Sequence, residues 1–104
     1  MAADLEITGH QFEECINHDL CVVDFFAEWC MPCVMMAPVI EELAEKMKKV
    51  KFAKVNIDEN QELARKFKIL SIPNFILFKD GKKIDRFIGT MSAEDFEDKL
   101  KKHL

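Results

Sequence analysis

The sequence predicts an α/β fold of three layers, in which one central mixed sheet lies between helices. Strand-like and helix-like segments alternate along most of the 104 residues, in the order β-α-β-α-β-α-β-β-α. The alternation favours parallel strands joined by helical crossovers, whereas an Asp80-Gly81 hairpin signal near the end requires one antiparallel pair. A chain of this length corresponds to one domain, which we expect to span residues 1–104.

The first half of the chain contains three predicted strands and two predicted helices. Residues 5–7 form a short strand, and a capping signal at Thr8 starts a short helix. Residues 20–26 are almost continuously apolar and rich in β-branched and aromatic side chains, which is typical of a strand covered on both faces. Apolar residues then recur at helical spacing over residues 36–47, and a strand follows at residues 50–57.

The second half contains a short helix, a hairpin and a final helix. A helix is predicted at residues 60–67 and a buried strand at residues 75–78. The Asp-Gly pair that follows suits a two-residue type I′ turn, and residues 82–88 alternate as a half-exposed strand does. Ser92 is the predicted N-cap of the last helix.

Composition and charge exclude several classes of partner. Apolar residues make up 49% of the chain, and 15 basic against 19 acidic side chains give a net charge of −4, so we expect no nucleic-acid partner. No apolar run approaches the roughly 20 residues that span a bilayer, so we expect no membrane association. Residues 1–6 show neither the basic segment nor the apolar run of a secretory signal. We therefore expect a cytoplasmic protein. We also expect a monomer.

Cys30 and Cys33 lie between a buried strand and the helix that follows, a position that favours redox chemistry. The positive end of the helix dipole stabilises a thiolate, which is the attacking species in disulfide exchange, so Cys30 is the predicted nucleophile. Cys33, nearly one turn further along, is predicted to close a disulfide with Cys30 and expel the substrate. Pro32 suits the first turn because its missing N–H has no partner there anyway.

Several segments in the right order show that the chain resembles the thioredoxin family over essentially its whole length. The similar segments are residues 24–33, Pro38, residues 54–58, Ser71-Ile72-Pro73, Asp80-Gly81 and Gly89. The resemblance implies a thioredoxin-like three-layer sandwich that reversibly reduces disulfides of protein substrates. It also implies that a thioredoxin reductase resupplies the electrons, and that the redox-active disulfide Cys30-Cys33 works without a metal or any other cofactor.

Asp24 is a single carboxyl group in an otherwise apolar strand. Burial raises the pKa of such a group, so Asp24 is either a proton acceptor for Cys33 or a satisfied buried polar group. The resemblance favours the proton acceptor. Lys54 shares strand parity with Val50 and Phe52. Either its stem is buried and its ammonium pairs with Asp24, or the side chain lies exposed at a strand end.

Six residues around the cysteines are predicted to form a flat, mostly apolar surface for substrates. They are Trp29, Met31, Pro32, Ile72, Pro73 and Gly89. Aromatic residues are enriched at interfaces, which favours docking at Trp29 over a place in the core. On the resemblance, Pro73 is cis and the backbone of Ile72 pairs with an extended segment of the substrate.

Departures from the family pattern leave rival functions open. Met31-Pro32 stands where Gly-Pro is commonest, Val34 where Lys is frequent, and Asn74 where Thr is usual. A missing cation reduces thiolate stabilisation. The Met31-Pro32 dipeptide leaves open a more oxidising glutaredoxin-like or disulfide-isomerase-like module as one alternative. The other is a non-catalytic zinc-binding or adaptor module that adds Cys15 or Cys21 as ligands, although the cysteine spacing fits no standard zinc site.

The remaining sulfur-containing side chains are predicted to fill the core. Cys15 falls on the apolar face of the first helix, and Cys21 falls in the buried strand. Met35, Met36 and Met47 are predicted to be core residues of the long helix.

Overall fold

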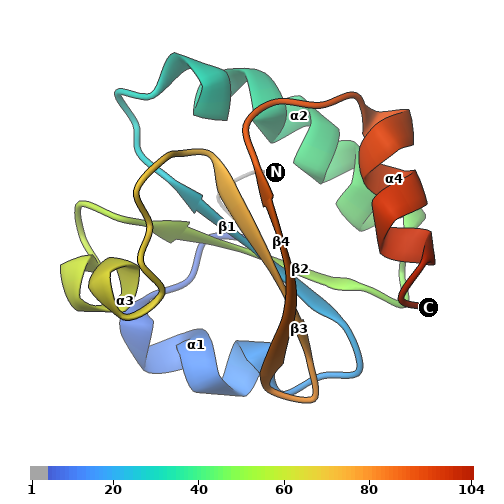
Figure 1. Cartoon of the computed structure of the whole chain (residues 1–104), viewed down its shortest axis with the longest axis horizontal. Helices are drawn as coiled ribbons and strands as arrows, with labels where there is room; N and C mark the ends of the chain where they lie inside the picture. The colour runs from blue at the N-terminus through green and yellow to red at the C-terminus, as the bar shows by residue number, and fades with distance from the viewer. Residues whose placement is uncertain (1–4) are drawn as a thin grey trace.

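A computed structural model describes residues 5–104, which form a central sheet with helices on both faces (Figure 1). The helices are α1 (Gly9–Ile16), α2 (Met31–Lys46), α3 (Gln61–Lys66) and α4 (Ala93–Lys101), and the strands are β1 (Cys21–Phe26), β2 (Lys51–Asn56), β3 (Asn74–Lys79) and β4 (Lys82–Ile88). Most of the segment examined for a secretory signal, residues 1–4, lies outside the described residues.

The sheet is mixed, as predicted, with the strand order β2-β1-β3-β4. β1 pairs in parallel with β2, to which α2 connects it, and antiparallel with β3. β3 and β4 form the antiparallel hairpin, where Asp80 and Gly81 have φ angles of 51° and 86°. Both values are positive, as a type I′ turn requires.

The strand predicted at residues 5–7 is wrong, because the structure has only a single bridge there. Glu6 forms only an isolated parallel bridge with Lys54, supported by backbone hydrogen bonds from Ile7 to Lys54 and from Lys54 to Leu5. The backbone N–H of Thr8 already donates to Oε1 of Gln11 at 2.9 Å, so the start of α1 ends the pairing after one bridge.

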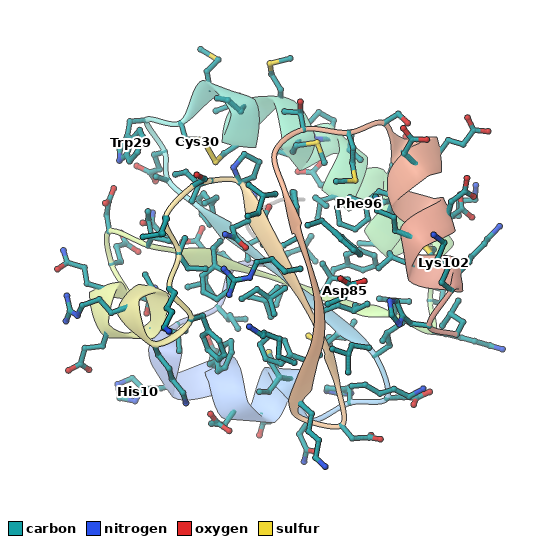
Figure 2. The ribbon with its side chains drawn as sticks, in the orientation of Figure 1. His10, Trp29, Cys30, Asp85, Phe96 and Lys102 are labelled. Atoms are coloured by element: carbon teal, nitrogen blue, oxygen red, sulfur yellow. A yellow bond between two sulfur atoms is a disulfide. The ribbon has the colours of Figure 1, made fainter. Side chains whose placement is uncertain are left out.

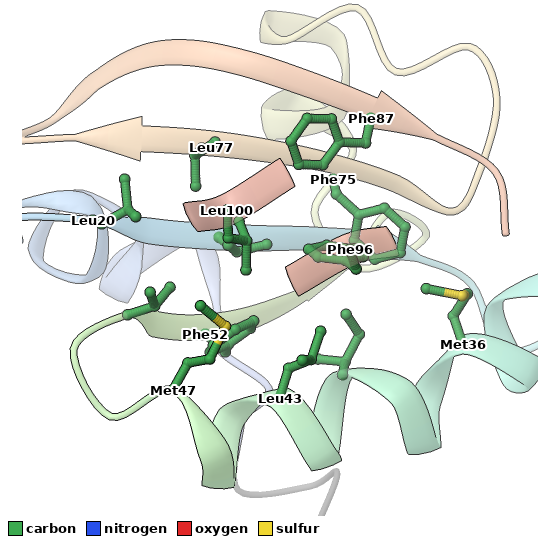
Figure 3. Close-up of a cluster of buried hydrophobic side chains, with 13 residues drawn as sticks. Leu20, Met36, Leu43, Met47, Phe52, Phe75, Leu77, Phe87, Phe96 and Leu100 are labelled. Atoms are coloured by element: carbon green, nitrogen blue, oxygen red, sulfur yellow. The ribbon is translucent and has the colours of Figure 1, made fainter. Parts of the chain in front are cut away.

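Two apolar cores lie on opposite faces of the sheet. Under α2 and α4, the ring of Phe96 meets that of Phe75 edge-on at 4.9 Å between centroids (Figure 3). Under α1 and α3, Phe12 packs edge-on against Phe78 at 5.6 Å. Strand alternation places Asp24 on the α2 face, since its neighbour at position 22 belongs to the first core.

Four of the five sulfur-containing residues predicted to be in the core are buried. Cys15, Cys21, Met36 and Met47 are 0–9% exposed, which confirms their placement. The prediction for Met35 is wrong, because this side chain is 63% exposed on the outer side of α2.

The last helix begins at the predicted cap. The Ser92 side chain accepts a hydrogen bond from the backbone N–H of Asp95 at 3.1 Å. Within residues 5–104, none of the helices has the length and apolar character needed to cross a membrane.

Replacing this cap lowers the stability of the fold. Ser92→Ala leaves the amide of Asp95 without its side-chain acceptor, so we expect the free energy of unfolding to fall by about 1 kcal/mol. Urea denaturation measures the change, and Ser92→Asp, which retains an acceptor, serves as the control. Equal losses in both variants would show that the cap contributes nothing.

Candidate active site

Cys30 and Cys33 form a disulfide where α2 begins (Figure 2). Cys30 is the N-cap residue of α2, and its Sγ accepts a hydrogen bond from the backbone N–H of Cys33 at 3.2 Å. Each cysteine is only 4% exposed. The helix terminus therefore directs an N–H group and the positive end of its dipole at the Cys30 sulfur, where negative charge develops on reduction.

Two other segments lie close to the disulfide. The Ile72-Pro73 peptide is cis, as predicted, and the carbonyl oxygen of Ile72 lies 3.8 Å from Sγ of Cys30. The backbone N–H of Gly89 donates to the carbonyl oxygen of Pro73 at 3.0 Å, which joins the end of β4 to this loop. Residues far apart in the chain thus converge at one edge of the sheet.

Trp29 lies on the surface beside Cys30 (Figure 2), with 70% of its side chain exposed, so the core alternative is wrong. Its indole Nε1–H donates to Oδ2 of Asp58 at 2.8 Å. Asp58 is not among the residues that the sequence predicts for the site. Its position just after β2 was the available signal, because β2 runs parallel to β1 and both strands end at the same edge, with Phe26 opposite Asn56.

Asp24 is 1% exposed, and its Oδ1 has no hydrogen-bond partner among the described residues. It is therefore not a fully satisfied polar group. Burial raises the pKa of Asp24 to about 7, although the positive charge of Lys54 acts in the opposite direction. The carboxyl group can thus hold or release a proton near neutral pH.

Lys54 is buried, as the first of its two predicted placements requires, so the exposed alternative is wrong. It lies opposite Asp24 in the β1–β2 register and is buried, at 7% exposure. Its Nζ lies 4.6 Å from the centroid of the Phe26 ring, and it forms no ion pair with Asp24 within the described part of the chain. The ammonium therefore acts on Asp24 through its charge rather than through a hydrogen bond.

The two free cysteines have no place in this site. Burial raises the pKa of Cys21 to about 12, which keeps it a thiol at neutral pH. Among residues 5–104, no group of three or more His, Cys, Asp or Glu side chains could hold a metal ion. Within that part of the chain, Cys30 and Cys33 therefore lack the further ligands that a structural zinc site requires.

Comparisons with known proteins agree with this geometry. A family model described as Thioredoxin matches residues 4–102. Thioredoxin of Staphylococcus haemolyticus is 43% identical over 103 residues, which cover 98% of this chain and 99% of that protein. A mutant thioredoxin from Halobacterium salinarum NRC-1 matches with a TM-score of 0.90 at 32% identity, covering 95% of this chain and 88% of the other.

A second solved structure extends the likeness to a eukaryotic protein. Oxidized mitochondrial thioredoxin 3 from Saccharomyces cerevisiae matches with a TM-score of 0.88 at 31% identity, covering 97% of each chain. The matches span nearly the whole sequence, and the disulfide joins the two cysteines of the predicted motif. This chain therefore belongs to the thioredoxin family and is a protein-disulfide oxidoreductase.

Proposed function

We propose that this protein reduces disulfides of other proteins in the cytoplasm, acting as a single domain and a monomer. The observation that carries the proposal is the Cys30–Cys33 disulfide at the start of α2. Each turnover leaves this pair oxidised, so a reductant must restore it. We assign that role to a thioredoxin reductase, the supply that membership of the family favours.

In the proposed reaction Cys30 attacks and Cys33 resolves. The Cys30 thiolate forms a bond to one sulfur of the substrate disulfide, and the other substrate sulfur leaves as a thiolate that takes up a proton. The Cys33 thiolate then attacks Sγ of Cys30, which releases the first substrate sulfur and closes the Cys30–Cys33 disulfide. Two electrons have passed to the substrate. The N–H of Cys33 at 3.2 Å supports Cys30 as the stabilised thiolate.

Asp24 is the proposed proton acceptor for Cys33. A general base works best when its pKa lies near the operating pH, and the pKa of Asp24 is raised to about 7. Asp24 lies on the α2 face of the sheet, and Cys33 is one of the residues on the buried face of α2. The positive charge of Lys54 supports this function because it keeps the pKa of Asp24 from rising further.

The predicted docking surface is the proposed binding site for substrates. Its members are Trp29, Met31, Pro32, Ile72, Pro73 and Gly89. Support comes from the 3.8 Å separation between Cys30 and Ile72, which puts the Ile72 backbone beside the attacking sulfur. An extended substrate segment that pairs with this backbone would bring its disulfide to Cys30.

A more oxidising, glutaredoxin-like or isomerase-like function is the second candidate. The Met31-Pro32 dipeptide favours it, because it stands between the cysteines where the family commonly has Gly-Pro. Val34 acts in the opposite direction: a cation near the sulfur stabilises the thiolate and with it the dithiol form, so an uncharged residue here makes the pair more reducing and supports the first candidate.

A coupled assay separates the two candidates by their electron supply. The protein is mixed with insulin as the disulfide substrate and recycled either by a bacterial thioredoxin reductase with NADPH or by glutathione. We expect rapid NADPH consumption that depends on this protein, and little turnover with glutathione alone. Turnover that requires glutathione and ignores the reductase would favour the second candidate.

A further inference from the structure

The first two turns of α2 carry an exposed apolar stripe on their outer side. Met31, Val34 and Met35 are 66%, 53% and 63% exposed, and Pro38 is also exposed. Their spacing of i, i+3, i+4 and i+7 puts all four side chains on one helix face. We name these four residues the outer α2 stripe.

The core does not explain this stripe. The buried face of α2 is already formed by Cys33, Met36, Ile40 and Leu43, so the helix is apolar on two sides where it begins. Further along the outer face, the exposed residues are the charged Glu42 and Glu45. Exposed apolar patches of this kind mark interaction sites.

The stripe is continuous with the redox site. Met31 directly follows Cys30, the sulfur that a substrate disulfide must reach, and residues 29–40 contain no charged side chain. At about 1.5 Å per residue, the helix from Met31 to Pro38 is about 10 Å long, which equals about three residues of extended chain. The outer face of α2 points away from the sheet (Figure 1), so such a segment can reach it.

We propose that the outer α2 stripe binds the segment next to the reacting cysteine of the substrate protein and selects segments rich in apolar residues. This inference rests on the proposed function and names its substrate class. Flexible, polarizable methionine side chains adapt to varied apolar partners. A polar substrate segment gains no hydrogen bond from the stripe and loses its hydration when it binds there, so it binds less tightly than an apolar segment.

Two disulfide peptides of equal charge test the proposal. They differ only in three residues beside one cysteine, which are Leu-Val-Leu in one peptide and Ser-Thr-Ser in the other. We expect wild-type kcat/KM to be about tenfold higher for the apolar peptide, a ratio that corresponds to about 1.4 kcal/mol. In a double variant with Val34→Thr and Met35→Gln, which conserves shape and charge, we expect the ratio to fall below about threefold.

The matched control is Ile84→Thr, which changes a 40% exposed apolar side chain of β4 outside the redox site. It should leave the ratio at the wild-type value. Each single variant, Val34→Thr and Met35→Gln, is measured too, so that a folding defect in the double variant does not decide the result. A wild-type ratio near one, or an unchanged ratio in all stripe variants, overturns the inference while reduction of both peptides upholds the proposed function. Failure of the wild type to reduce either peptide overturns the proposed function, and the inference falls with it.

Discussion

Serine in place of Cys30 should lower the rate of protein-disulfide reduction by at least about a thousandfold, because the remaining Cys33 sulfur lies further along α2 and is not the one that accepts the N–H at the helix start. Serine in place of Cys33 should give a different result. Cys30 can still form the mixed disulfide, but the sulfur that closes the Cys30–Cys33 bond is gone. We therefore expect the Cys33→Ser variant to accumulate as a covalent adduct, observed by mass spectrometry under non-reducing conditions as the summed mass of protein and substrate.

Cys15→Ser is the control for both variants, since Cys15 is buried and has no part in the disulfide. It should retain the wild-type rate and form no lasting adduct. Peptide mapping locates the bond in the trapped species. An adduct through Cys15 or Cys21, or a Cys30→Ser variant that still turns over, would contradict the assignment of Cys30 as the attacking group.

Asp24 should make the folded protein less stable as the pH rises towards neutrality. The folded state holds the proton up to a pKa of about 7, whereas the ordinary value is 3.8. Between these values the folded state binds more protons than the unfolded state, so the free energy of unfolding falls with pH. The stabilisation is complete below about pH 4 and lost above about pH 7, a difference of about 4 kcal/mol.

Asp24→Asn removes this ionisation while keeping the shape of the side chain. Denaturation of the oxidised protein at pH 4.5 and pH 8 should show a much smaller decline in the variant than in the wild type. Asp98→Asn, at an exposed position on α4, should keep the wild-type decline. An unchanged decline in Asp24→Asn would mean that the pKa of Asp24 is not raised in the folded state.

The Asp24→Asn variant should also release substrate more slowly from the mixed disulfide at pH 7, which a purely structural role would not produce.

The elements were predictable from the sequence because their signals are local. The strand predicted at residues 82–88 is β4 without change, and the long helix begins beside the cysteines as expected. Residues 5–7 were not predictable in the same way, since their apolar pattern does not reveal that α1 starts at once and limits the pairing to one bridge. The length of a strand depends on its partner as well as on its own residues.

The chemistry of the site was predictable to the extent that it lies in contiguous residues. Cys30 and Cys33 are three residues apart at a strand-to-helix junction, so their pairing followed from the motif. The bond between Trp29 and Asp58 joins residues 29 positions apart and depends on the parallel β1–β2 register. The position of Lys54 above an aromatic ring depends on side-chain packing, which strand parity does not specify.

The reduction potential of the Cys30/Cys33 pair tests most directly whether this protein is a reductant. Equilibration in thiol–disulfide buffers, followed by counting of free thiols by mass, gives the value. We predict a potential near or below about −270 mV, as for a thioredoxin that reduces protein disulfides. A potential about 70 to 150 mV higher, in the range of isomerases and oxidants, would contradict the proposed direction of electron flow.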